Sequence, residues 1–382
     1  MLNKFYKKKK EFIKKIKLKI LNKIKYKNKK KIKVKFCVFA GRKSNLEILH
    51  EYIKILLNEN IIQEYHIFDF TRNKIDKEYL YQSFLFLKKN YNKKIFIHNK
   101  NNNININNNQ YDWSPFYKKI SKKKFYKNSI IIKCDDDILF IDINGLKNAI
   151  KNRINDKKTF LFLSNCINNN ICSYFQQNKF PLLKNKLNIY PKGGILGSIF
   201  ENPKFAYIMQ YQFINDNIDN LNNLYNYYLK DIYINTRISI NFILINGEDC
   251  KYFKNTNFND EYELSSYYPE KLLRPNKIIG NFITCHYSYS LQEKILLKTN
   301  DLKKLYNKLL EKYKLDYKKV DYKYKNELLN EYRVNKISKN KFYVNNYLYG
   351  KYNISVNGKY LYINFDKNKI EIFKKKSYFE IK

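Results

Sequence analysis

Early in the chain, apolar segments alternate with segments of helical periodicity, and this alternation constrains the fold more than any other feature. Residues 34–40, 64–70 and 94–98 have the composition of strands. Between them, residues 46–57 and 76–90 carry apolar side chains at the spacing of amphipathic helices. Strands that alternate with helices in this way predict a largely parallel α/β sheet with helices on its faces.

A later apolar strand, residues 129–134, ends in the acidic triplet Asp135, Asp136 and Asp137. In open α/β sheets the carboxyl ends of the strands face the ligand crevice. Adjacent carboxylates repel one another, and a hard divalent cation both neutralises them and binds diphosphate oxygens. Side chains alternate along an extended segment, so Asp135 and Asp137 are the expected metal pair and Asp136 faces the other way. The alternative is a solvated acidic turn, which the apolar residues 138–140 make less favourable.

The loop after the first strand combines small and basic residues with a predicted helix N-terminus. Ala40, Gly41 and Arg42 precede Ser44 and Asn45, either of which is expected to cap the helix. This arrangement favours a phosphate or a nucleobase carbonyl, although an ordinary strand-to-helix turn would look the same. Because the loop contains neither GxGxxG nor a Walker motif, it does not indicate dinucleotide or P-loop chemistry.

The order of these elements resembles the nucleotide-sugar half of the GT-A glycosyltransferases. The resemblance rests on the Ala40-Gly41-Arg42 loop, a second strand that ends at Asp69-Phe70-Thr71-Arg72-Asn73, and the strand that ends in the acidic triplet. Residues 134–142, 168–177 and 237–242 also resemble glycosyltransferase-like proteins of large viruses, algae and fungi. The resemblance implies a Rossmann-type, mostly parallel sheet flanked by helices.

In that family the acidic motif, called DxD, holds Mn²⁺ or Mg²⁺ on the diphosphate of the sugar nucleotide. The resemblance therefore implies a hexosyltransferase-like enzyme that transfers a sugar from a nucleoside diphosphate sugar, with a UDP-sugar as the expected donor, to a glycan or glycoconjugate. It implies metal ligands at Asp135, Asp137 and His286. It also implies nucleotide or diphosphate contacts from Ala40, Gly41, Arg42, Thr71, Arg72 and Asp136.

An inverting enzyme of this kind also needs a base near the acceptor hydroxyl. The acidic stretch 249–263, expected to be a loop, offers Asp260 or Glu261, with Asp249 in reserve. Each of these carboxylates could instead belong to a solvated loop. The aromatic residues Trp113 and Tyr117 could stack on a sugar or a base, although such residues at helical spacing are more often part of a core.

The pattern of the whole chain predicts three parts. Residues 1–33 form a Lys-rich leader whose apolar spacing suits a basic amphipathic helix on an anionic membrane surface, or else a solvated leader. Residues 34–315 form the catalytic domain, with a nucleotide-sugar half (34–142) and an acceptor half (143–315). Residues 316–382 form a linker helix and a small antiparallel β module.

The formal net charge of +41 raises the possibility of a nucleic-acid partner. Most of the basic residues are Lys, scattered among Asn, Ile and Tyr, so a biased codon composition is the simpler cause. Specific nucleic-acid recognition usually uses Arg, and none is expected here. Two alternatives stay open: a sugar nucleotidyltransferase, and a non-enzymatic basic protein that binds nucleic acid or membrane.

The sequence also predicts where the protein resides. It contains no apolar run of 18 or more residues and no evident signal peptide, which predicts a cytoplasmic or peripheral membrane protein. The six cysteines form no CxxC pair, and we expect them to be reduced and buried.

Overall fold

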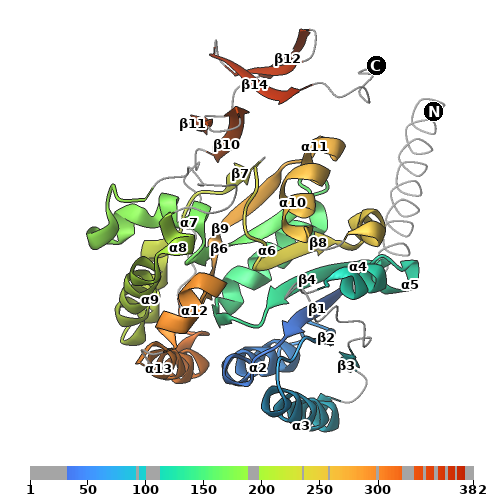
Figure 1. Ribbon diagram of the computed structural model, residues 1–382, viewed down its shortest axis with the longest axis vertical. Coiled ribbons are helices and arrows are strands. Elements are labelled where there is room, and N and C mark those ends of the chain that lie inside the picture. The colour runs from blue at the N-terminus through green and yellow to red at the C-terminus, as the bar shows by residue number, and fades with distance from the viewer. Residues whose placement is uncertain are drawn as a thin grey trace, which may run out of the picture.

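The structure is a computed structural model (Figure 1). It describes residues 32–91, 94–99, 112–187, 198–234, 236–256, 259–297 and 301–320, together with the backbone of strands between 331 and 374. Most of the predicted basic leader, residues 1–31, lies outside the described residues.

Within the described residues, eleven strands form one sheet in the order β11-β10-β7-β9-β6-β8-β4-β1-β2-β3, with β5 paired to β9. The strands are β1 (Lys33–Ala40), β2 (Glu64–Asp69), β3 (Ile95–His98), β4 (Ser129–Asp135), β5 (Ile138–Ile141), β6 (Leu161–Ile167), β7 (Ile232–Ile234), β8 (Phe242–Asn246), β9 (Asn276–His286), β10 (Glu331–Ser338) and β11 (Lys341–Tyr347). The protein is therefore α/β, as its sequence predicts.

The sheet is mixed in direction. Strands β3, β2, β1 and β4 run parallel to their neighbours, as the alternation of strands and helices predicts. Strand β8, however, lies antiparallel between β4 and β6, and β9 is antiparallel to both β5 and β7. In addition, β6 is parallel to β9 and β10 is parallel to β7. A continuous parallel order, as predicted for most of the sheet, is thus found among the described strands only in β3-β2-β1-β4. An apolar run of residues indicates that a strand is buried on both faces, but it does not indicate whether the neighbouring strands are parallel or antiparallel to it.

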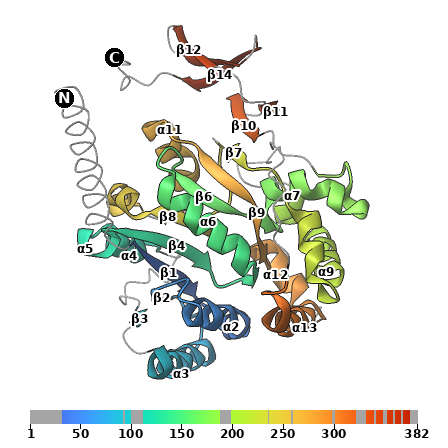
Figure 2. The ribbon, with the colours of Figure 1, turned by 180° about the vertical axis from the view of Figure 1, so that it is seen from behind.

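Helices cover the sheet and close its edges. They are α2 (Lys43–Asn58), α3 (Lys74–Tyr91), α4 (Ser114–Ile120), α5 (Lys123–Tyr126), α6 (Ile143–Asn155), α7 (Asn170–Gln176), α8 (Ser198–Glu201), α9 (Pro203–Ile218), α10 (Asp260–Tyr262), α11 (Tyr268–Leu272), α12 (Ser290–Leu296) and α13 (Asp301–Asp316). Seen from behind, α6 lies across the sheet, where it contacts β4, β8 and β9 (Figure 2). Helices α2 and α13 contact β5 and each other.

The helices predicted at residues 46–57 and 76–90 are confirmed as α2 and α3. The predicted cap of α2 is wrong: the helix already begins at Lys43, and Arg42 occupies the N-cap position without a side-chain cap. Asn45 lies inside the first turn and is buried. The side chain of Arg42 points to the acidic triplet and does not cap the helix. Its backbone carbonyl accepts the first hydrogen bonds of the helix, from the amides of Asn45 and Leu46.

The parallel half of the sheet determines where a site can form. Because β1, β2 and β4 are parallel neighbours, their carboxyl ends lie at the same edge. This brings the loops after residues 40, 69 and 135 together, although they are far apart in the chain.

The core contains all six cysteines, which are buried and form no disulfide, as expected. Among the described residues, no helix combines the length and the apolar character needed to cross a membrane. Strands β12 (Tyr352–Asn357), β13 (Tyr360–Phe365) and β14 (Asn368–Lys374) form a separate antiparallel sheet. By contrast, β10 and β11 extend the main sheet beside β7.

Candidate functional site

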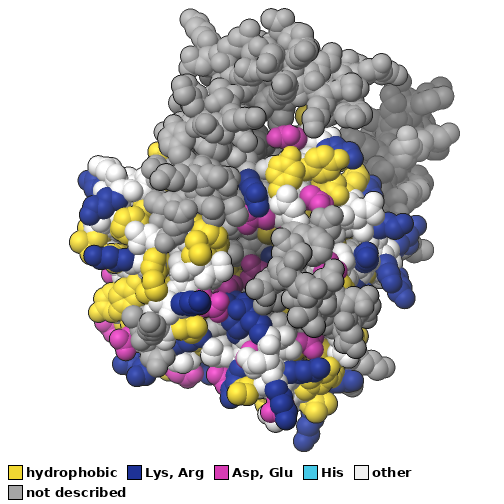
Figure 3. Space-filling model, viewed as in Figure 1, with side chains coloured by type: hydrophobic (Ala, Val, Ile, Leu, Met, Phe, Trp, Pro, Cys, Tyr) yellow, Lys and Arg dark blue, Asp and Glu magenta, His cyan; other side chains and the backbone are white. Residues whose placement is uncertain are grey.

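A pocket of about 250 Å³ opens at the shared edge of β1, β2 and β4. Basic and acidic side chains lie next to one another near the middle of the face in Figure 3. Most of the residues predicted for the site line this one pocket: Gly41, Arg42, Arg72, Asp135, Asp136, Asp137, Asp260 and Glu261. The other lining residues are Phe39, Phe70, Trp113, Lys133, Ile240 and Asn241.

The carboxylate of Asp136 binds the loop between β1 and α2. Its Oδ2 accepts hydrogen bonds from the backbone amides of Gly41 (3.0 Å) and Arg42 (2.7 Å). The loop leaves little room, because a Cβ atom on Gly41 would lie 3.2 Å from both Asp136 Oδ2 and the carbonyl oxygen of Phe70. Asp136 thus holds the Gly41-Arg42 turn against the end of β4, and the glycine permits this close approach.

The guanidinium group of Arg42 is surrounded by three carboxylates. It forms ion pairs with Asp136, with Asp137 (2.7 Å to Oδ2) and with Glu293 on α12 (2.9 Å to Oε1). Burial lowers the pKa of Arg42, but these carboxylates outweigh it and raise the pKa well above its usual value. Arg72 also contacts Glu293, at 3.3 Å. Arg42 is therefore mainly an internal counter-ion of the acidic triplet.

Asp137 lies between Arg42 and His286. Its Oδ2 is 3.3 Å from Nε2 of His286, which is the last residue of β9. Its Oδ1 is buried and has no hydrogen-bond partner, and the same is true of Nδ1 of His286. Burial opposes the ionisation of Asp137, but His286 and Arg42 together hold its pKa far below the usual value.

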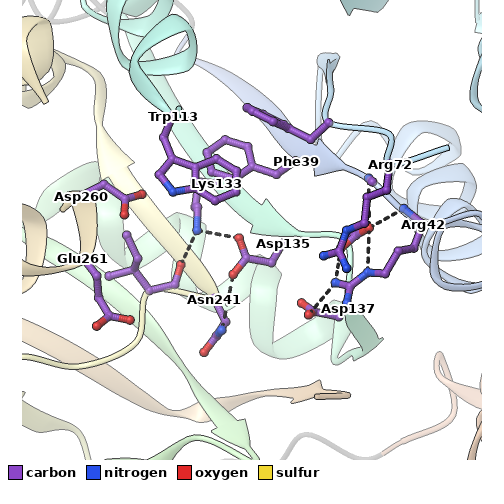
Figure 4. Close-up of a pocket in the computed structure, with 14 residues that line it drawn as sticks. Phe39, Arg42, Arg72, Trp113, Lys133, Asp135, Asp137, Asn241, Asp260 and Glu261 are labelled. Carbon is purple, nitrogen blue, oxygen red and sulfur yellow. Dashed lines mark hydrogen bonds and ion pairs between the residues drawn. The ribbon is translucent and has the colours of Figure 1, made fainter. Parts of the chain in front are cut away.

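Asp135 is paired with a buried lysine instead. Nζ of Lys133 donates to Oδ1 of Asp135 (2.6 Å) and to the backbone carbonyl of Ile240 (3.0 Å), while Asn241 donates to Oδ2 of Asp135 (3.4 Å) (Figure 4). Burial raises the pKa of Asp135 to about 6; Lys133 works against this shift and Asp137 adds to it. Lys133 therefore does not fully offset the burial of this carboxylate and the repulsion from Asp137.

Asp135 and Asp137 are the residues of the pocket that could hold a hard divalent cation. Both carboxylates line the same pocket, and the buried Oδ1 of Asp137 has no hydrogen-bond partner among the described residues. Oxygen ligands are those that Mg²⁺ and Mn²⁺ prefer. The predicted third ligand, His286, contacts Asp137 directly, and no group of three or more His, Cys, Asp or Glu side chains is arranged for a metal within the described part of the chain.

Asp260 and Glu261 lie at the opposite end of the pocket (Figure 4). The predicted loop is wrong here, since residues 247–255 form a 3₁₀ helix and residues 260–272 form α10, a π-helical turn and α11. Tyr117 donates to Oδ2 of Asp260 (2.7 Å), and Nε of Arg237 donates to Glu261 (3.0 Å). Burial raises the pKa of both carboxyl groups; Lys133 opposes the shift at Asp260 and Arg237 opposes it at Glu261.

Four predicted residues lie outside the pocket lining: His286, which contacts Asp137 from behind the lining residues, and Asp249, Ala40 and Thr71. Asp249 accepts two hydrogen bonds from Arg274, at 2.6 and 2.9 Å, and this buried ion pair supports the fold rather than the pocket. Ala40 is fully buried in β1. Thr71 donates its hydroxyl to Asp69 (2.7 Å) and thereby closes the turn after β2.

Aromatic side chains form one wall of the pocket. Trp113 stacks on Phe39, with ring centroids 4.8 Å apart and 6° between the ring planes, and it also contacts Phe70. Tyr117 is fully buried, so it belongs to the core and acts on the site through Asp260. Of the two aromatic residues considered from the sequence, only Trp113 lies where a ligand could touch it.

Lys133 and Asn241 were missed from the sequence, but one of them has a local signal. Lys133 interrupts an otherwise apolar strand two residues before Asp135, so the pleat turns both side chains to the same face. Asn241 lies within the segment 237–242, and only the pairing of β8 with β4 brings it to the triplet.

We compared the chain with models of known protein families and with curated proteins, and neither comparison finds a match.

Proposed function

We propose that the protein is a metal-dependent glycosyltransferase, which transfers a sugar from a nucleoside diphosphate sugar to an acceptor hydroxyl. The observation that carries this proposal is a single pocket with two acidic ends. Asp135 and Asp137 lie at one end, and Asp260 and Glu261 lie at the other. A metal-dependent transfer from a diphosphate uses a cation on the leaving group, and an inverting transfer also uses a base on the acceptor hydroxyl.

The first end suits the diphosphate. Asp135 and Asp137 would hold Mn²⁺ or Mg²⁺, which when bound stabilises the negative charge of the leaving diphosphate. Arg72 lines the same end and adds positive charge near the phosphate oxygens. Arg42 and Asp136 keep the loop after β1 in place, so their role is to position this end of the pocket.

The second end suits the acceptor. A carboxylate with a raised pKa is a better base near neutral pH than an ordinary surface carboxylate. Tyr117 orients Asp260 and Arg237 orients Glu261, so each candidate base has a partner that fixes its direction. Trp113 and Phe39 stack on each other and line the same pocket, so they would add apolar surface beside the substrate.

The size of the pocket suggests that it would enclose only part of the nucleotide sugar. A volume of about 250 Å³ lies just below the usual range for small-molecule sites. It suits the sugar and diphosphate rather than the whole nucleotide. The GT-A type of Rossmann fold belongs to the same proposal, and its support is the parallel order β3-β2-β1-β4 with the triplet after β4.

The test is metal-dependent binding of nucleotide sugars by the full chain. Isothermal titration with UDP-, GDP- and CDP-sugars, with Mn²⁺ or with a chelator, should detect binding of at least one donor only when the metal is present. The double variant Asp135→Asn with Asp137→Asn should abolish this binding. The double variant Asp219→Asn with Asp301→Asn removes two exposed carboxylates that do not line the pocket and should bind as the wild type does.

Two results would contradict the proposal. Absence of metal-dependent binding across the whole donor panel would exclude a sugar-nucleotide site. Release of pyrophosphate from a nucleoside triphosphate and a sugar phosphate would instead identify a nucleotidyltransferase.

A further inference from the structure

A cluster of lysines covers the outer side of α4 and α5. We define this lysine patch as Lys118, Lys119, Lys122, Lys123, Lys124 and Lys127. All are exposed except Lys119, which is partly buried. Figure 3 shows basic side chains at the edge of the molecule where Figure 1 draws these two helices.

The positive charge of the lysine patch is uncompensated. No Asp or Glu occurs between Asp112 and Asp135, and no ion pair joins a patch lysine to a carboxylate of the described residues. The pKa of Lys119 is lowered by burial and then by its neighbours Lys122 and Lys124, which places like charges close together.

Several lysines on other surfaces of the same protein are paired with carboxylates. On α13, Lys312 contacts Asp316 at 2.9 Å and Lys314 contacts Glu51 at 3.2 Å. Lys147 contacts Glu59 at 2.5 Å. A lysine-rich composition would scatter unpaired lysines over the surface, whereas the patch gathers six within ten residues and without an acidic neighbour. Mutual repulsion makes such a cluster unfavourable unless an anionic partner neutralises it.

The inner side of the same segment is firmly packed, so the patch is a defined surface. Phe116, Tyr117, Ile120 and Phe125 are buried against the core. The chain enters the sheet beside the patch, since the amide of Lys33 donates to the carbonyl of Asn128 at 3.0 Å. The Lys-rich leader, whose sequence predicts an amphipathic helix, therefore joins the fold next to the patch.

We propose that the lysine patch on α4 and α5 is a docking surface for an anionic membrane. Lysine is a hydrated point charge that suits diffuse attraction to acidic headgroups. Proteins that bind polynucleotides usually add arginine or exposed aromatic rings that stack on bases. The patch contains no arginine. Of the two aromatic residues among its lysines, Phe125 is buried and Tyr126 is partly buried against the core. This inference does not depend on the proposed enzymatic activity.

The test compares two variants of the full chain that lose the same charge. The patch variant carries Lys122→Gln, Lys123→Gln and Lys124→Gln. The control variant carries Lys151→Gln, Lys157→Gln and Lys158→Gln, three exposed lysines on and after α6. Binding is measured by sedimentation with vesicles of phosphatidylcholine alone and of phosphatidylcholine mixed with phosphatidylserine.

We expect the wild type and the control variant to bind the anionic vesicles equally within about twofold. The patch variant should bind them between about tenfold and about a hundredfold more weakly, since each lysine near an anionic surface contributes separately. Equal losses in both variants would show that only net charge matters and would overturn the proposal. So would equal binding of the wild type to neutral and anionic vesicles.

A second measurement detects the surface directly, whatever the leader contributes. Acetylation of the wild type with an amine reagent, read by mass spectrometry, should show that anionic vesicles protect Lys122, Lys123 and Lys124 but not Lys157 and Lys158. Failure to protect the patch would refute the assignment. Tighter, patch-dependent binding to single-stranded RNA or DNA than to anionic vesicles would replace the membrane with a polynucleotide as the partner.

Discussion

Replacement of Arg42 by methionine should strongly destabilise the protein. The substitution keeps an unbranched side chain of similar reach but removes the charge that Asp136, Asp137 and Glu293 share. Loss of one partner from a buried ion pair costs about 3–5 kcal/mol, because the remaining charge is left uncompensated. Asp136 keeps two backbone hydrogen bonds from the loop, and the Arg42 side chain is 15% exposed. We therefore expect the lower end, about 3 kcal/mol.

The assay is urea denaturation followed by circular dichroism, in the presence of a chelator. Arg237→Met is a matched control, since Arg237 pairs with Glu261 alone at the other end of the pocket and is 33% exposed. This control should lose only about 1 kcal/mol. A loss in Arg42→Met no greater than in Arg237→Met would refute the reasoning that the guanidinium neutralises the triplet.

The same variant links stability to the cation. Arg42 binds Asp137, one of the two proposed metal ligands, so the loss of the guanidinium should let the protein bind Mn²⁺ more tightly. A ligand that binds only the folded state stabilises it, and the stabilisation grows with the logarithm of the ligand concentration over Kd. Mn²⁺ should therefore raise the urea midpoint of Arg42→Met more than that of the wild type. An equal increase in both proteins would show that Arg42 and the cation do not compete for the same carboxylates.

Two further predictions concern pH. In Tyr117→Phe, Asp260 loses a hydrogen bond that favours its ionised form, so the pKa of Asp260 should rise further. The acidic limb of the pH–rate profile for sugar transfer should therefore move to higher pH. An unchanged limb would exclude Asp260 as the base. Burial opposes the ionisation of Glu59, but hydrogen bonds from Lys147, Tyr317 and Lys318 lower its pKa to about 2. A lowered folded pKa stabilises the protein above the ordinary value of 4.5, and this stabilisation is lost as the pH falls towards 2. Urea unfolding should therefore show Glu59→Gln less stable than the wild type at pH 7, with a difference that shrinks between pH 4.5 and about 2; a constant difference would contradict the assignment.

Much of the structure of residues 34–142 could be predicted because its signals are local. The apolar periods of residues 34–98 identify three strands and two helices, all of which the structure contains. Ser129 to Cys134 likewise identifies the strand that carries the triplet. Parallel neighbours meet at one edge, so these local patterns also predict that Gly41, Arg42 and the triplet lie together.

The structure of residues 143–315 was harder to predict because its geometry depends on contacts between distant segments. Residues 249–263 are acidic and polar, which suggested a loop, yet packing against α4 folds them into helical turns. The result separates Asp249, which pairs with Arg274, from Asp260, which reaches the pocket. Local propensity cannot make this distinction.

The sequence by itself determined that a strand delivers three carboxylates to the ligand-facing edge of an α/β sheet, because the strand and its acidic end are properties of a few consecutive residues. Only the tertiary structure decided what neutralises each of them. Asp136 and Asp137 bind Arg42, and Asp135 binds Lys133. The carboxylates have different partners because strand pairing and the turn after Asp135 bring charges that are far apart in the chain within ion-pair distance. No periodicity in the sequence encodes such distances.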